Sequence, residues 1–178
     1  NAYNQTLGVW AIFSTVPNET QNLMVLQRAG STSAVQIGFR EISGSYRLVV
    51  WNWGGGALVW SNALPSANTW HYYNYTFDGT NHRLYVDGVE VGHSTTTATQ
   101  NAVPQYLYLG SYSGGEYFEG NIDEARYSLT HKSAGWIETE YNNQISPGSF
   151  VVIGEEQVMN HLVSAGICND PLVLAGYP

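Results

Sequence analysis

The spacing of the acidic side chains in this sequence indicates whether two of them could form a catalytic pair. Glycoside hydrolysis needs two of them, one as acid and one as nucleophile or base, facing one another across the substrate. Glu138 and Glu140 fall in a predicted helix, and the pair at 155–156 begins the C-terminal segment. Glu116 and Glu119 lie in a glycine-rich turn, where acidic residues are normally solvated. The sequence therefore predicts that the protein is not an enzyme.

Other catalytic and metal motifs are absent from the sequence. It contains no Gly-x-Ser-x-Gly and no His-Glu-x-x-His segment. The five histidines show no i,i+4 pair, which argues against a zinc site. The single cysteine, Cys168, has no second thiol with which to form an internal disulfide or a cysteine-based metal site.

Composition limits the class of protein and its partners. A length of 178 residues fits one domain, and 13 Tyr and 6 Trp favour strands over helices. The net charge of −8, with only six Lys and Arg that form no run, argues against a nucleic-acid partner. No stretch approaches the ~20 apolar residues of a membrane-spanning helix, so we expect no membrane insertion.

Alternation of apolar and polar residues dominates the chain and predicts many short strands. Asp78-Gly79 and Asp87-Gly88 are hairpin signals nine residues apart, which indicates a meander of three strands. This number of short strands predicts a sandwich or a barrel. The predicted strands are 7–13, 22–28, 33–40, 46–53, 70–77, 82–86, 89–93, 105–111, 116–119 and 121–128.

Two segments near the C-terminus break this pattern. Residues 133–141 predict a short helix with Ser133 as N-cap, and 155–164 a second one that ends before Gly166. The last stretch is apolar and proline-containing. We therefore divide the chain into a domain at 1–154 and an arm at 155–178, which docks on the domain or on a neighbour.

Four segments of the sequence stand out: 70–79 (WHYYNYTFDG), 84–88 (LYVDG), 120–127 (GNIDEARY) and 136–147 (WIETEYNNQISP). They resemble the laminin-G-like domains of the concanavalin A-like lectin and glucanase superfamily, and the last is similar to copies in large bacterial surface proteins. The resemblance covers about residues 5–154. It implies an all-β fold, a two-sheet antiparallel jelly-roll sandwich with one or two short helices near the C-terminus.

The resemblance also implies a structural calcium ion. In these domains the Asp of the "I-D-E" strand helps to hold the ion, together with groups near the start of the domain. Asp123 matches that position, and Asn1 and Asn4 offer polar side chains near the start. Calcium prefers such oxygen ligands.

Exposed aromatic side chains are the best candidates for ligand contact. If residues 73, 75 and 77 face the core, as the family's apolar positions do, alternation directs 72, 74 and 76 outward. The same parity applied to the other strands extends this set. The candidate ligand-binding residues are Trp51, Trp53, Tyr72, Asn74, Tyr85, Tyr106 and Tyr108. Flat rings with an amide among them suit glycans, whose pyranose rings stack on aromatic faces, but they also suit protein contacts or packing beneath loops.

Two functions remain open from the sequence. One is a non-catalytic, lectin-like module that recognises carbohydrate or a cell surface in adhesion. The alternative is a structural decoration or assembly protein of a virion, tail fibre or cell-surface filament. Its apolar arm at 171–174 would then dock on a neighbouring subunit or form a homo-oligomer. Both place the protein outside the cell, on a cell surface or on a virion, with a glycan or a surface protein as partner.

Overall fold

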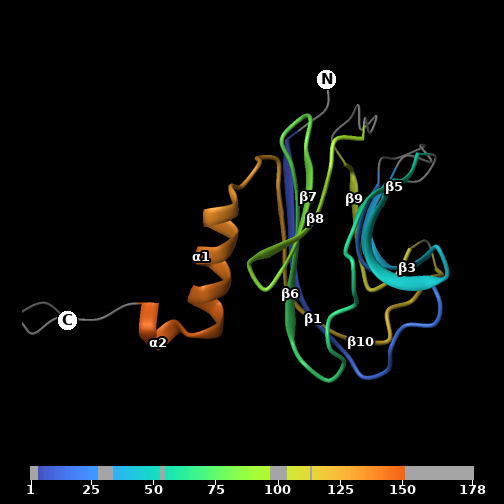
Figure 1. Ribbon diagram of the computed structural model, residues 1–178, viewed down its shortest axis with the longest axis horizontal. Helices are drawn as coiled ribbons and strands as arrows, with labels where there is room; N and C mark the ends of the chain where they lie inside the picture. Colours follow the sequence, from blue (N-terminus) through green and yellow to red (C-terminus); the bar gives the residue numbers. More distant parts are fainter. Residues whose placement is uncertain (1–3, 28–33, 53–54, 97–103, 113, 151–178) are drawn as a thin grey trace, which may run out of the picture.

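Two five-stranded antiparallel sheets pack face to face in the computed structural model (Figure 1), which describes residues 4–27, 34–52, 55–96, 104–112 and 114–150. The two-sheet antiparallel sandwich that the family resemblance implies is thus confirmed. The first sheet has the order β10 (Gly120–Ser128), β1 (Gln5–Phe13), β6 (His71–Phe77), β7 (His82–Val86), β8 (Val89–Ser94). The second has the order β5 (Gly56–Trp60), β4 (Ser45–Asn52), β3 (Ala34–Ile42), β2 (Gln21–Gln27), β9 (Tyr106–Leu109).

The predicted three-strand meander forms β6, β7 and β8, and its second turn shows why the sequence specifies it. Asp87 and Gly88 both have positive φ, 54° and 80°, as a two-residue turn between twisted antiparallel strands requires. Asp87 also accepts a hydrogen bond from the backbone N–H of Tyr72, at 2.9 Å. The turn is therefore tied to the start of β6.

The core lies between the sheets and is built from the inward residues of each alternating strand. Leu7, Val9, Ala11 and Phe13 of β1 are all buried. Phe39 of β3 meets Phe13 edge-on, with ring centroids 5.2 Å apart, so aromatic contacts join the two sheets. This parity fixes which side chains each strand presents outward.

One polar side chain, His82, is buried beside this core. Its Nε2 lies 2.8 Å from the carbonyl oxygen of Thr96, which can only accept, so Nε2 carries the proton and Nδ1 accepts from the Tyr75 hydroxyl at 2.7 Å. Burial lowers the pKa of His82 from its ordinary value of 6.5. The imidazole is thus held in its neutral form.

A pH-dependent stability follows from this lowered pKa. As pH falls from 7 to 5, the unfolded chain takes up a proton at His82 that the folded protein resists, so the free energy of unfolding decreases below about pH 6.5. Urea denaturation at both pH values should give a smaller decrease for His82→Gln than for the wild type. The control is His93→Gln, which replaces an exposed histidine on the neighbouring strand. Equal decreases in all three proteins would contradict this assignment.

The sequence misplaces two strands. Residues 116–119 are not a strand, since Glu116 adopts a positive φ of 50° and the segment runs as a loop into β10. Conversely, β5 begins at Gly56, the last of three consecutive glycines that indicate only a turn. Local sequence misled both predictions, because pairing with a distant strand decides whether such a segment extends.

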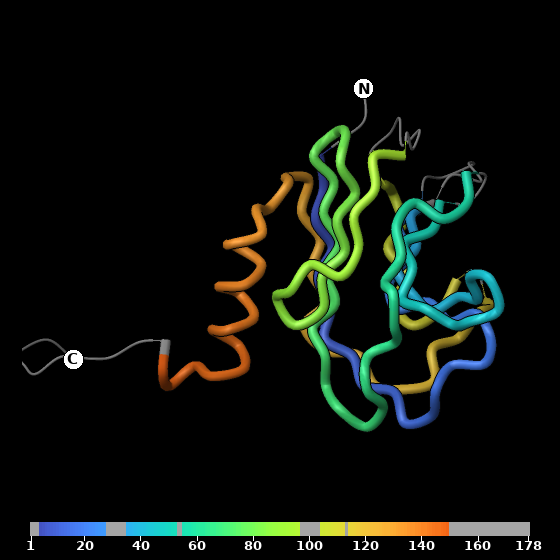
Figure 2. Tube along the Cα trace, in the orientation of Figure 1, coloured from blue at the N-terminus to red at the C-terminus, as the bar shows by residue number. Residues whose placement is uncertain are grey.

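The predicted helix is present as α1 (Ala134–Ile145), followed by the short α2 (Pro147–Phe150). The Ser133 side chain accepts a hydrogen bond from the N–H of Trp136, at 3.2 Å, which confirms the N-cap. α1 lies along the outer face of the first sheet (Figures 1 and 2). The predicted helix at 155–164 and the arm lie outside the described residues, as does Cys168.

Candidate functional site

The outer face of the first sheet carries three of the predicted ligand-binding residues. Parity places Tyr72, Asn74 and Tyr85 outward as expected, but their exposed fractions are 0%, 0% and 1%. The expectation that these side chains are exposed is therefore wrong. α1 lies over this face, and alternation along a strand reports the direction of a side chain, not what covers it.

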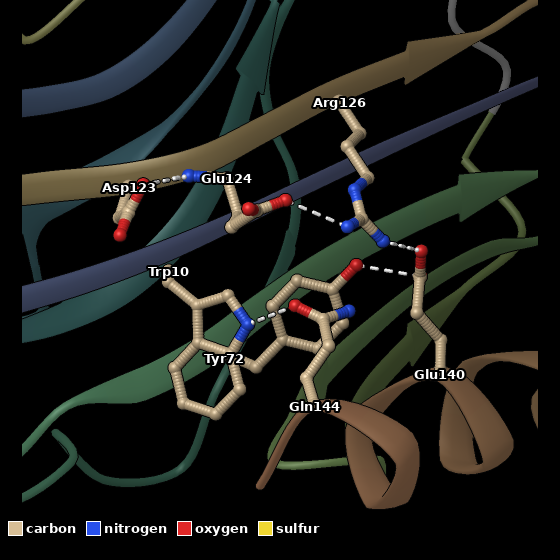
Figure 3. Close-up of polar contacts among 7 residues, drawn as sticks. All are labelled: Trp10, Tyr72, Asp123, Glu124, Arg126, Glu140 and Gln144. Atoms are coloured by element: carbon tan, nitrogen blue, oxygen red, sulfur yellow. Dashed lines mark hydrogen bonds and ion pairs between the residues drawn. The ribbon is translucent and has the colours of Figure 1, made fainter. Parts of the chain in front are cut away.

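Polar contacts attach α1 to this face, as Figure 3 shows. The Tyr72 hydroxyl donates to Glu140 at 2.5 Å, and Trp10 Nε1 donates to Gln144 at 2.5 Å. Arg126 donates to Glu140 and, at 2.7 Å, to Glu124. Burial and the Glu140 carboxylate together raise the pKa of Tyr72. This network fixes the helix against the sheet.

The outer face of the second sheet, here called the open face, carries other members of the predicted set. The register aligns Tyr108, Val25, Gln36 and Trp51 across four neighbouring strands. The β3–β4 hairpin curves so that its hollow side opens away from the first sheet, and both described helices lie on the other side of the molecule (Figure 1). Trp53 lies outside the described residues.

Trp51 is held by a cation and its ion-pair partner. The Arg40 guanidinium lies 5.1 Å from the Trp51 ring centroid, within range of a cation–π contact. Arg40 also donates to Glu116 at 2.9 Å and to Gln36. Burial lowers the pKa of Arg40, and the Glu116 carboxylate partly offsets this effect. The contacts fix the orientation of the indole.

Glu116 belongs to this site, contrary to the expectation that it is solvated. Its carboxylate accepts from Arg40 and, at 2.6 Å, from Asn22 Nδ2. The alternation of residues 33–40 is enough to predict that the side chains of Arg40 and Gln36 point outward. The pairing of Arg40 with Glu116 could not be predicted in this way, because it joins residues 76 positions apart.

Tyrosines continue the open face toward its β9 edge. The rings of Tyr106 and Tyr108 lie 6.4 Å apart and those of Tyr108 and Tyr112 6.2 Å apart. Tyr106 is 51% exposed, and Gln27 Nε2 donates to the Tyr112 hydroxyl at 3.1 Å. Gln36 Nε2 is buried with no hydrogen-bond partner among the described residues. Aromatic surfaces and a polar group capable of hydrogen bonding thus share one face.

Asp123, the predicted calcium ligand, lies in β10 of the first sheet. Its Oδ1 accepts from the adjacent backbone N–H of Glu124, at 2.8 Å. It pairs in register with Trp10, whereas Asn4 precedes β1, six residues or about 20 Å away along an extended strand. Within the described ranges, no group of three or more His, Cys, Asp or Glu side chains could hold a metal ion. Asn1 lies outside these ranges, and calcium at Asp123 stays a prediction.

The chain matches a known family over most of its length. The model of the concanavalin A-like lectin/glucanases superfamily matches residues 1–138. No curated protein matches. Neither α1 nor α2 is long and apolar enough to cross a membrane.

Solved structures share the fold at low identity. Domain 4 of AbnA, a GH43 extracellular arabinanase from Geobacillus stearothermophilus in complex with arabinotriose, is 14% identical, with a TM-score of 0.63 over 76% of this chain and 65% of that one. Trypanosoma rangeli sialidase is 15% identical, with a TM-score of 0.59 over 80% and 23%. A putative carbohydrate binding protein from Bacteroides ovatus is 14% identical, with a TM-score of 0.53 over 76% and 40%. The chain covers less than two thirds of each, and at these identities the likeness shows the fold alone.

Proposed function

Because this chain belongs to the concanavalin A-like lectin/glucanase superfamily, we propose that it is a non-catalytic carbohydrate-binding module whose ligand lies on the open face. The observation that carries the proposal is the row of aromatic side chains on that face, with Trp51 held by the Arg40–Glu116 ion pair. A preorganised ring costs little entropy to dock on a sugar.

The dimensions of the open face favour an oligosaccharide over a single sugar. Trp51 on β4 and Tyr108 on β9 are separated by three inter-strand steps, or about 14 Å. Between them lies Gln36, whose amide is fully buried beneath the surface. A ligand that reached both rings would pass over this amide.

The role of Glu116 supports binding over hydrolysis. A glycosidase requires one carboxyl group free to give a proton and a second one opposite. Glu116 is instead bound by Arg40 and Asn22, and its contacts serve to hold Trp51 in place. We therefore assign no catalytic residue on this face.

The names of the similar structures support a carbohydrate ligand. One was solved with arabinotriose bound, and another is described as a putative carbohydrate binding protein. We propose a location outside the cell or at its surface, in keeping with the extracellular arabinanase and with the scarcity of Lys and Arg.

Glycan-array binding of the full chain, with and without EDTA, tests the proposal. We expect binding to at least one oligosaccharide, with an affinity reduced at least tenfold (about 1.4 kcal/mol) in Trp51→Ala, because a central aromatic anchor is removed. Isothermal titration gives the dissociation constants. Loss of binding in EDTA would support a calcium ion.

A matched control separates this effect from a general loss of exposed tryptophan. Trp70→Ala removes a 42% exposed indole that lies beside Asp123, on the first-sheet side, and should leave the affinity unchanged. No binding to any glycan, or equal losses in the two variants, would refute the assignment to the open face.

A further inference from the structure

A pocket lies between α1 and the outer face of the first sheet, on the other side of the sandwich from the open face. Its volume is about 460 Å³, within the 300–1,000 Å³ that small-molecule sites usually occupy. Strands β1, β6 and β10 form its floor and the start of α1 its wall. Its lining includes Gly8, Asn74, Arg126, Lys132, Trp136 and Glu140.

Asn74 is the unusual residue of this floor. The side chain is fully buried, its Oδ1 has no hydrogen-bond partner among the described residues, and its Nδ2, beside the Tyr72 hydroxyl, has none of good geometry. A Cβ at Gly8 would lie 2.6 Å from this Nδ2, so glycine is required for the amide to reach across β1. Leaving a buried amide unpaired is costly, and a bound molecule with hydroxyl groups would supply the missing partners.

One cation without an ion-pair partner among the described residues lies at the same pocket. Two of the six basic residues of the whole chain, Arg126 and Lys132, line it. Arg126 is committed to Glu124 and Glu140. The Lys132 ammonium instead lies over the Trp136 ring, 4.7 Å from its centroid, with no ion-pair partner in the described part of the chain. It is available to an anion.

We propose that this pocket is a second binding site, for a small acidic sugar of the hexuronate class. The carboxylate of the sugar pairs with Lys132, and its hydroxyl groups exchange hydrogen bonds with the buried Asn74 amide. The ring lies beside the Trp136 indole at the rim. The site is independent of the open face, since no residue is shared between them.

Isothermal titration of the full chain with sodium glucuronate tests this site, with glucose as the neutral comparison. We expect saturable glucuronate binding, weakened at least tenfold by Lys132→Gln, and no comparable binding of glucose. Arg83→Gln, which removes a cation from the same sheet outside the pocket, should bind as the wild type does.

Asn74→Leu separates binding from folding. It keeps the number and branching of the side-chain heavy atoms and removes the polar atoms of the buried amide, so the melting temperature should be retained or raised while glucuronate affinity falls at least tenfold. Trp51→Ala should leave this affinity intact, which distinguishes the site from the open face. Absence of saturable binding, equal binding of glucose, or full affinity in both Lys132→Gln and Asn74→Leu would overturn the proposal.

Discussion

Replacing Gly38 by alanine is expected to destabilise the protein by about 3 kcal/mol or more. Gly38 lies on β3 opposite a bulge in β2 between Asn22 and Met24. A Cβ there would lie 2.1 Å from the carbonyl oxygen of Gln21 and 2.9 Å from Asn22 Cα. Both are backbone atoms that no change of rotamer can move aside, so the two central strands would have to separate.

Gly135→Ala is the matched control for this substitution. Gly135 lies in α1 with no atom within 4 Å of its ideal Cβ, and alanine there should stabilise the protein by up to about 1 kcal/mol. Urea denaturation of both variants measures the contrast. A Gly38→Ala protein as stable as the wild type would show that the bulge in β2 can relax.

Replacing Glu116 by alanine is expected to cost about 2 kcal/mol of stability and at least a tenfold loss of glycan affinity. The substitution leaves Arg40, whose side chain is only 13% exposed, without its ion-pair partner, and it removes an acceptor from Asn22. Arg40 is then free to leave the Trp51 ring. Urea denaturation measures the first effect and titration with the array ligand the second.

Glu119→Ala provides the comparison, because Glu119 lies in the same loop with an exposed side chain. Its stability should stay within about 0.5 kcal/mol of the wild type. A double-mutant cycle of Glu116→Ala with Arg40→Met isolates the coupling between the two charges. Equal effects of the two glutamate substitutions would contradict the role given to Glu116.

The direction in which each side chain points from its strand was predictable, because it depends on neighbouring residues. The alternation in β6 and the Asp87-Gly88 turn specify which side chains point inward and where the chain reverses. Tyr72 and Asn74 accordingly point to the predicted face. Their burial was not predictable, since it depends on where α1, which begins 60 or more residues further along the chain, comes to lie.

The open face illustrates the same limit. Trp51 and Tyr108 could be selected from parity, but their place in one row depends on the register of β4, β3, β2 and β9. The pairing of Arg40 with Glu116 depends on a loop that was wrongly predicted to be a strand. Such contacts arise from the tertiary fold and have no local pattern.

The position of α1 and α2 sets the geometry of attachment. The described chain ends at Phe150, on the side of the first sheet that α1 covers (Figure 1). Both sheets, packed about 10 Å apart, therefore stand between this exit and the open face. A surface or partner protein that bound α1 or α2 would therefore meet the module on the face opposite the aromatic row and leave that row accessible.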